Sequence, residues 1–303
     1  MKAEISSRLP GWNRGKCWIA SAMICSLFTG IVQALPNPAL VEAERLYQQT
    51  QYSQSLGLLE SNEGKTAPEY ALMGKCYYKL EKYKNATEAL EKAVLADPHN
   101  SHYMNWLGKA YGKRAETSSF FTAPSYATKA RHYFEQAVEL DPTNLDALDD
   151  LLDYLMEAPG FLGGGQEKAA QLAERIRKQN PTQYHFMMAR LAEKRKQWQE
   201  AEQHWRKAVE LAPSDEGLLI GLAKLLARQS RHSESEQVFA QAEKIAPDNP
   251  RLKFERAKAY IESSRNREAA RKLLEEYLRS SPLTPDDPPR SEAQRLLEKV
   301  ASG

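Results

Sequence analysis

Cysteine is scarce in this sequence, with three residues among 303. Two of them, Cys17 and Cys25, lie in an N-terminal segment that differs from the rest of the chain. Only Cys76 remains outside that segment, so the remainder cannot form an internal disulfide. Cys76 falls within a predicted helix, where we expect a small packed side chain rather than a reactive thiol.

Recognisable catalytic motifs are absent as well. The chain has no His-Glu-x-x-His pair for zinc, no nucleophile elbow and no Gly-x-x-x-x-Gly-Lys-Ser/Thr loop for phosphate. Its six histidines are scattered. His99 and His102 are close in sequence, but no third ligand accompanies them, which favours a solvated loop over a metal site. We therefore expect no enzyme activity, no metal and no cofactor.

The sequence also lacks a strong excess of either charge. Lys and Arg number 42 against 40 Asp and Glu, which gives a formal net charge of +2. Removal of residues 1–34 would take away four basic residues and one acidic residue, leaving −1. A general nucleic-acid binder needs a clear basic surplus to neutralise phosphates. The composition therefore argues against nucleic acid as a partner.

Only one long hydrophobic run occurs, and it lies near the N-terminus. The run at residues 17–34 carries no charge, follows several basic residues, and places Val32 and Ala34 at the two positions that a signal peptidase tests. This pattern predicts a signal peptide and an exported, periplasmic protein. The alternative is an uncleaved inner-membrane anchor with the rest of the chain outside the cytoplasm, because the run is close to the length that spans a bilayer.

The remainder of the chain is dominated by a repeating pattern, clearest in residues 67–98. Counted from Ala67, it has Gly74 at 8, Tyr77 at 11, Tyr83 at 17, Ala86 at 20, Leu90 at 24, Ala93 at 27 and Pro98 at 32. The pattern resembles the tetratricopeptide repeat, which recurs at about 34 residues. In that family small residues mark where the two antiparallel helices of a unit cross, and Pro marks where the second helix stops.

The resemblance implies an all-α fold, a right-handed α-solenoid of about seven antiparallel helix pairs. Together with the signal-like N-terminus, it indicates an exported bacterial repeat protein. We place the units near 36–66, 67–100, 101–144, 145–181, 182–215, 216–249 and 250–282. Residues 283–303 would form a C-terminal cap and tail, because Ala293, Leu296, Leu297 and Val300 define the apolar face of one helix.

The family also implies a binding surface, because the first helix of each unit lines a concave groove. Position 9 of units two to seven, which faces this groove, is Lys75, Lys109, Asp153, Arg190, Lys224 and Lys258. Five of the six are basic, and an acidic partner segment would relieve their mutual repulsion. The alternative interpretation is that these cations are solvated or pair with acids on neighbouring helices.

The middle of the expected groove is acidic. Unit four carries Asp146, Asp149, Asp153 and Glu157 along one helix face. Asn105 with Lys109 resembles part of the clamp that holds C-terminal carboxylates in some relatives. The corresponding position of unit two is Ala71, however, so the clamp is incomplete.

Two units contain extra residues that we expect between their helices. Unit three has ten more between Gly108 and Ala130, and unit four has five more. The apolar side chains in these insertions are Phe120, Phe121, Phe161 and Leu162. They would emerge on the same edge of the solenoid, either packing on each other or forming a lip that docks a partner.

These observations favour a non-enzymatic scaffold that binds a segment of another protein in its groove, with a role in cell-envelope assembly. A structural, self-associating homo-oligomer is the second interpretation. An enzyme whose site lies on the inserted loops is the least favoured, because those loops are mainly Phe, Ser and Gly.

Overall fold

The computed structural model describes residues 37–62 and 64–301, and all regular structure in these ranges is helical. The all-α solenoid of helix pairs expected from the repeats is therefore confirmed. The expected signal peptide or anchor, residues 1–34, lies outside the described residues. Among the helices that are described, none combines the length and the apolar character needed to cross a bilayer.

Fourteen of the helices form seven consecutive antiparallel pairs. The pairs are α1 (Pro38–Gln48) with α2 (Tyr52–Glu60), α3 (Ala67–Lys79) with α4 (Tyr83–Ala96), α5 (Ser101–Thr117) with α6 (Ala123–Leu140), α7 (Leu145–Glu157) with α8 (Gln166–Ile176), α9 (Pro181–Lys194) with α10 (Trp198–Leu211), α11 (Glu216–Arg228) with α12 (His232–Ile245), and α13 (Pro250–Glu262) with α14 (Arg267–Arg279). A 3₁₀ helix, η1 (Gly160–Leu162), precedes α8, and α15 (Arg290–Ala301) follows the last pair.

The first helix of most pairs begins at a capping side chain. Because the first N–H groups of a helix have no partner within it, a short polar side chain that accepts from them fixes the helix start. The residues that cap in this way are Asn37, Asn100, Asn144, Asn180, Asp215 and Asn249. This recurring cap explains why the first helices start in the same register.

The turn within a plain pair is equally regular. A residue with positive φ ends the first helix, as at Glu81 and Lys196. The next N–H then bonds back to a carbonyl five residues earlier, for example Lys82 to Tyr77 at 2.9 Å. This left-handed cap satisfies free carbonyls and reverses the chain within a few residues.

The pair with the longest insertion departs from this plan. We expected its ten extra residues to form a region between the helices, but α5 and α6 extend to 17 and 18 residues, against 13 and 14 in α3 and α4. The connection is only residues 118–122. The extra sequence therefore mainly lengthens the pair, since residues such as Pro124 and Ala127 suit the first turns of a helix.

The helices of a pair cross at residues with little or no side chain, as the repeat pattern predicted. Ala86, Ala130 and Ala201 are fully buried. At Gly108, an added Cβ would lie 2.6 Å from the Phe134 ring. Such a distance is below van der Waals contact, so the close approach of α5 and α6 requires glycine there.

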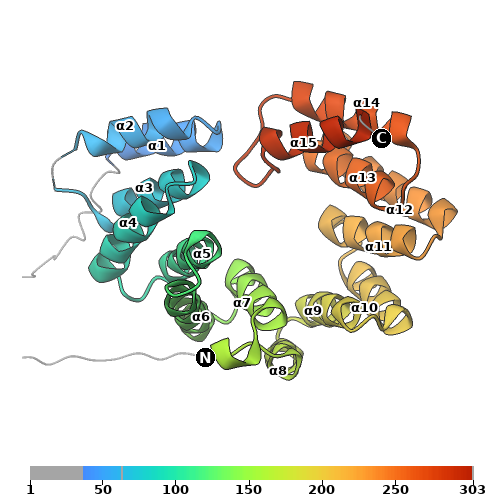
Figure 1. Cartoon of the computed structure of the whole chain (residues 1–303), viewed down its shortest axis with the longest axis horizontal. Coiled ribbons are helices and arrows are strands. Elements are labelled where there is room, and N and C mark those ends of the chain that lie inside the picture. Colours follow the sequence, from blue (N-terminus) through green and yellow to red (C-terminus); the bar gives the residue numbers. More distant parts are fainter. Residues whose placement is uncertain (1–36, 63, 302–303) are drawn as a thin grey trace, which may run out of the picture. The chain divides into compact units, whose positions relative to one another are not determined.

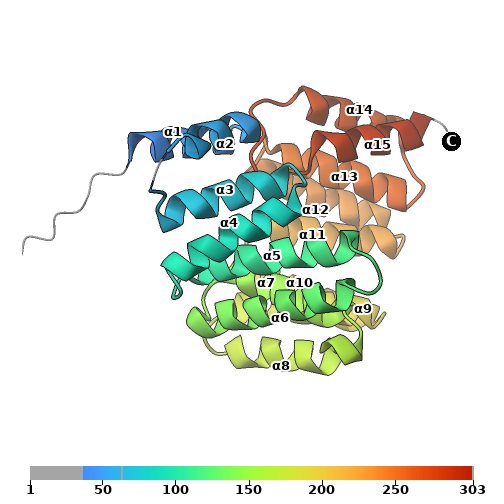
Figure 2. The ribbon, with the colours of Figure 1, turned by 60° about the vertical axis from the view of Figure 1, so that its left-hand side comes forward.

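Successive pairs stack so that the first helices share one side. Figure 1 shows α3, α5, α7, α9, α11 and α13 on the inner side of the curve, with the second helices outside. Figure 2 shows the same helices stacked in layers. Neighbouring first helices contact one another directly, as in α3 with α5, α5 with α7 and α7 with α9. They form a concave surface built from discontinuous parts of the sequence.

The C-terminal helix caps the last pair, as expected. α15 contacts α13 and α14 and buries Ala293, and the Tyr277 hydroxyl donates to the Pro288 carbonyl. The connection before α15 reaches the N-terminal pairs, where the Lys79 ammonium donates to the Pro285 carbonyl (Figure 1). The Asp286 carboxylate adds an attraction that opposes the burial-driven lowering of the Lys79 pKa. The two ends of the repeat array are thereby linked.

The glycine crossing gives a matched pair of substitutions on one helix. Gly108→Ala should lower the free energy of unfolding by about 1–3 kcal/mol, because its methyl group would overlap the Phe134 ring. Gly112→Ala, one turn later with open space around its Cβ position, should raise it by about 0.5–1 kcal/mol. Urea unfolding followed by circular dichroism measures both. Equal effects of the two substitutions would contradict this account of the crossing.

The link between the ends predicts a change in size. Lys79→Met keeps the apolar stem but removes the donor to Pro285, so the array should open and its radius of gyration should rise in small-angle X-ray scattering. Lys82→Met, three residues away on an exposed side chain, is the control and should leave the radius unchanged. An unchanged radius in Lys79→Met would show that other contacts hold the ends together.

Candidate functional site: the concave groove

The described part of the concave surface includes two hollows that flank α7 and a further one, of about 600 Å³, among α1, α3 and α5, which Lys75 lines. Of the two beside α7, the larger, of about 640 Å³, lies among α7, α9, α10, α11 and α13, and its apolar lining includes Phe186, Trp205 and Ile220. The smaller, of about 460 Å³, lies among α3, α5, α6, α7 and η1, and its apolar lining includes Tyr78, Phe134, Tyr154 and Leu162. Asp153 and Glu157 line both. Helix α7 is therefore an acidic ridge between a mostly apolar smaller hollow and a larger hollow that combines aromatic side chains with many charged ones.

Most of the cations expected to line the groove are paired with acids of neighbouring first helices or of α15. Lys109 contacts Asp150 at 3.3 Å, Arg190 contacts Asp153 at 2.5 Å, Lys224 contacts Glu255 at 2.5 Å, and Lys258 contacts Glu292 at 3.7 Å. These ion pairs agree with the alternative interpretation of the basic series, in which the cations pair with acids on neighbouring helices. Asp153 is the acidic member of the position-9 series itself, whereas Asp150, Glu255 and Glu292 stand at other positions, so the series alone did not reveal those three partners.

Lys75 is the exception in this series. No carboxylate of the described residues lies within 4 Å of its ammonium, which instead stands 5.3 Å from the centre of the Trp106 ring. Burial lowers the pKa of Lys75, and the nearby charges of Glu44, Asp146 and Asp286 oppose that shift. A cation–π contact thus replaces the ion pair at this end of the groove.

Asn105 and Lys109, which resembled half of a carboxylate clamp, both face a carboxylate of the chain itself. The buried Asn105 amide donates to Asp150 at 2.8 Å, and its carbonyl oxygen has no partner. The Lys109 ammonium also stands 5.0 Å from the Trp106 ring centre. Asp150 therefore occupies the position that a partner carboxylate would need, and burial raises the pKa of Asp150.

Asp149 is the least compensated acid of the ridge. Its carboxylate accepts from the Gln183 amide at 2.5 Å, and no cation of the described chain lies within the 4 Å of an ion pair. Burial raises the pKa of Asp149 to about 7, although the charge of Arg190 opposes the shift. The neighbouring charges of Asp153 and Asp150 raise it further.

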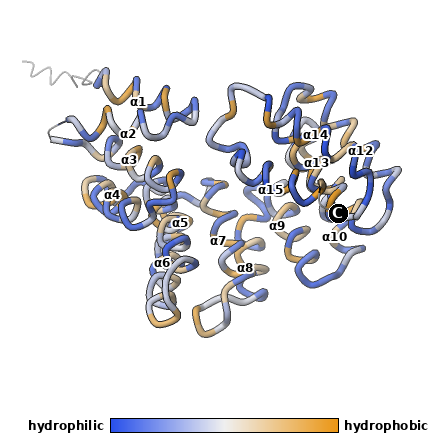
Figure 3. The backbone as a smooth tube through the Cα atoms, turned by 45° about the horizontal axis from the view of Figure 1, so that its top comes forward, coloured by the Kyte–Doolittle hydropathy of each residue, from blue (hydrophilic) through white to orange (hydrophobic). Residues whose placement is uncertain are grey.

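The side chains expected at the insertion edge divide into two groups. Phe120, Phe121 and Phe161 are 85%, 90% and 83% exposed, and the first two rings meet edge to face at 5.9 Å. Leu162 is half-buried and lines the smaller hollow, and its carbonyl accepts from the Tyr154 hydroxyl at 2.9 Å. Figure 3 shows the apolar tips of the two inserted loops at the same edge.

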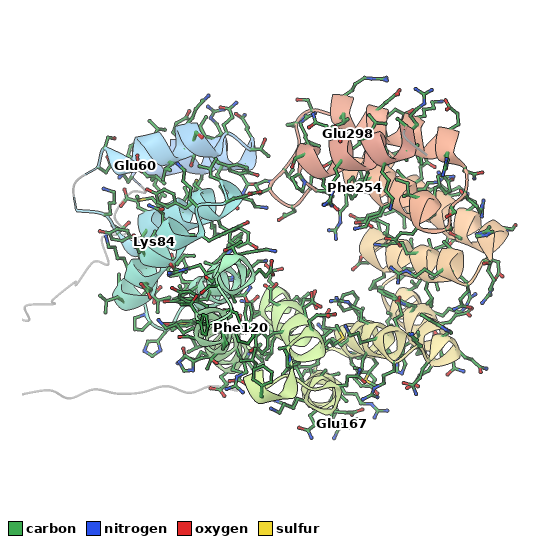
Figure 4. The ribbon with its side chains drawn as sticks, in the orientation of Figure 1. Glu60, Lys84, Phe120, Glu167, Phe254 and Glu298 are labelled. Atoms are coloured by element: carbon green, nitrogen blue, oxygen red, sulfur yellow. The ribbon has the colours of Figure 1, made fainter. Side chains whose placement is uncertain are left out.

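Several groove residues were not anticipated from the repeat pattern. Tyr78 and Phe186 are half-buried and line the hollows, and the buried Trp205 ring on α10 lines the larger one. Figure 4 shows first-helix side chains reaching into the space inside the curve, whereas Lys84 on α4 and Glu167 on α8 lie outside. Within the described part of the chain, no three His, Cys, Asp or Glu side chains are arranged to hold a metal ion.

The raised pKa of Asp149 predicts how its substitution changes stability with pH. Between the ordinary aspartate pKa of about 4 and the folded value of about 7, the folded state binds this proton more tightly than the unfolded state. The contribution of Asp149 to stability is therefore greatest at low pH and is lost as the pH rises through 7. In the Asp149→Asn variant, the new amide would stay neutral and still accept from Gln183.

The melting temperature of Asp149→Asn minus that of the unsubstituted protein should therefore increase by a few degrees when the pH is raised from about 5 to about 8. Asp248→Asn, on an exposed turn, serves as the control and should show no such trend. A difference that stays constant with pH would mean that Asp149 is ionised throughout this range.

Comparison with known proteins agrees with this architecture. Residues 186–250 match the tetratricopeptide repeat family, and residues 28–93 match the family described as anaphase-promoting complex, cyclosome, subunit 3. No match is found among curated protein sequences.

Three solved structures illustrate the likeness in fold. A tetratricopeptide repeat protein of Parabacteroides merdae is 15% identical with a TM-score of 0.56, covering 87% of this chain and 98% of its own. A thermophilic repeat protein of Thermus thermophilus is 19% identical with a TM-score of 0.50, covering 62% and 97%. Human IFIT1, as a dimer with PPP-AAAA, is 19% identical with a TM-score of 0.51, covering 80% and 54%.

Proposed function

We propose that this chain captures a segment of another protein in its concave groove, because residues 186–250 match the tetratricopeptide repeat family, whose members generally act as non-catalytic scaffolds that bind protein partners. The observation that carries the proposal is the pair of hollows beside α7. A concave surface with aromatic lining and a few placed charges is the usual form of a binding site. The groove residues are Lys75, Asn105, Lys109, Asp149, Asp153, Arg190, Lys224 and Lys258.

The charges of this groove would select and align the partner rather than supply most of the affinity. The paired cations lie between about one fifth and one third exposed, so each ion pair is partly screened by solvent. The apolar walls of the hollows would provide most of the favourable free energy when a partner side chain enters them.

The exposed rings at the insertion edge offer a second contact for the same partner. Phe120, Phe121 and Phe161 expose most of their surface, and large aromatic side chains are preferred anchors at protein interfaces. Leu162 connects this edge to the smaller hollow. A partner that leaves the groove past η1 would meet these rings next.

The setting that we propose is the cell envelope. The support is the uncharged run at residues 17–34 behind a basic N-terminus, the pattern of a signal peptide or inner-membrane anchor. The scaffold would then act on the outer side of the cytoplasmic membrane, in the periplasm.

Site-specific photo-crosslinking in the cells that make the protein tests the groove and its location together. A benzoylphenylalanine in place of the exposed Arg251, which lines the larger hollow, should give an adduct with another protein. The same group in place of Lys244, an exposed residue on the outer helix α12, should not. The adduct should be recovered from the envelope fraction, and mass spectrometry would identify the partner.

Three results would count against the proposal. Adducts of equal yield from both positions would place the contact outside the groove. An adduct that contains only two copies of this chain would favour a self-associating structural role. Recovery from the cytoplasm alone would contradict export while leaving the groove in place.

A further inference from the structure

We infer that the partner segment carries a Lys or Arg between two apolar side chains, and that it crosses α7 with the cation at Asp149 and Asp153 and the apolar side chains in the two hollows. This inference rests on the proposed groove function and specifies the chemistry of the partner. It rests on two observations: α7 carries more acids than the cations that pair with them, and a hollow with aromatic side chains lies on each side of those acids.

The surplus of acid follows from the ion pairs of α7. The helix carries five acids, namely Asp146, Asp149, Asp150, Asp153 and Glu157. Three of them pair with one cation each, contributed by Lys109, Arg190 and Lys194. The remaining two have no cation within 4 Å among the described residues. A cationic side chain from a partner would supply the missing counter-charge.

The hydrogen bonding of Asp149 leaves room for such a cation. Gln183 donates to one carboxylate oxygen, and an ionised carboxylate can accept several more hydrogen bonds. Asp149 and Asp153, one helical turn apart, both line the larger hollow. An arginine guanidinium or lysine ammonium entering there would meet both carboxylates.

The apolar part of the pattern follows from the placement of the hollows. Asp153 lines both of them, so a segment with its cation at this point has a hollow with aromatic side chains in each direction. In the larger hollow, Phe186 and Trp205 meet edge to face at 5.5 Å. In the smaller, Tyr154 and Phe134 lie with their ring centres 6.4 Å apart. Either site suits a leucine or an aromatic side chain.

An acidic segment, which the basic series suggested, fits this groove less well. Lys109, Arg190, Lys224 and Lys258 already have acidic partners. A partner carboxylate would have to displace one of these and leave a carboxylate of the chain without its cation. Lys75 and Arg251 lack an acid within 4 Å among the described residues; Lys75 is engaged with Trp106 at the far end of the groove, and Arg251 is an exposed residue in the first turn of α13.

Selection from a random library of displayed dodecapeptides on the immobilised protein tests the pattern without knowledge of the natural partner. Enriched peptides should contain Lys or Arg with an apolar residue within four positions on each side. Asp149→Asn should weaken their binding about tenfold or more, because a charge-assisted contact is lost. Gly112→Leu should also weaken it, since Gly112 lines the smaller hollow and an added Cβ there meets open space.

The control is Asp248→Asn, an equal change of charge on an exposed turn away from the groove, which should bind the peptides as the unsubstituted protein does. Circular dichroism confirms that all variants are folded. Enrichment of acidic peptides, or binding unaffected by Asp149→Asn, would overturn the inference. The inference would also be overturned if no enriched peptide bound more weakly to both Asp149→Asn and Gly112→Leu than to the unsubstituted protein.

These failures remain distinct from failure of the proposed function. If acidic peptides are enriched and compete with the Arg251 photo-crosslink, the groove binds a partner but the assigned chemistry is wrong. If the crosslink forms only from the outer surface, the groove proposal itself fails, whatever the library yields.

Discussion

The close crossing of two helices within each pair is the constraint on which the rest of this structure depends. A helix pair cannot bury its apolar face alone, so it must stack on its neighbours. The depth of the crossing sets how they stack, and it requires residues such as Gly108 or Ala130, because a larger side chain would push the helices apart. The curvature, and with it the concave surface, follows from repeating this geometry seven times. Binding chemistry then depends on which side chains the first helices turn toward the inside.

On that inner surface, electrostatics link one pair to the next. Cations on α5 and α9 reach acids on α7, and cations on α11 and α13 reach acids on α13 and α15. Each contact contributes modestly because it is partly solvated. Together they pair most of the groove cations, with Lys75 and Arg251 as the exceptions among the described residues, while α7 carries two acids more than the cations that pair with it. The charge available to a partner is therefore the charge that remains after these internal ion pairs form, and not the summed charge of all groove side chains.

The contrast between contacts within a helix pair and contacts between distant residues explains which features of the fold and the groove could be predicted from the sequence alone. Helix pairs and crossing residues depend on contacts within a few dozen residues, and the repeat spacing reports them directly. The ion pairs and hydrogen bonds of the groove join distant residues whose repeat positions differ, such as Lys224 with Glu255, 31 positions apart, and Asn105 with Asp150, 45 apart. The link from Lys79 to Pro285 spans 206 positions and depends on the curvature of the whole array. Neither the groove contacts nor the link between the two ends can be read from a local sequence pattern.

The two enlarged units have a physical consequence for the groove between them. Helices α5 and α6 run several residues beyond the length of the plain pairs, and the segment after α7 folds into η1 instead of a tight turn. Their extra surfaces enclose a hollow that plain pairs would leave shallow, with Pro159 and Leu162 as one wall. Because this hollow lies beside the acidic ridge, the insertions add an apolar site where the charge is least balanced. Shortening both insertions to the plain spacing should therefore abolish the smaller hollow while leaving Asp149 and the larger hollow intact.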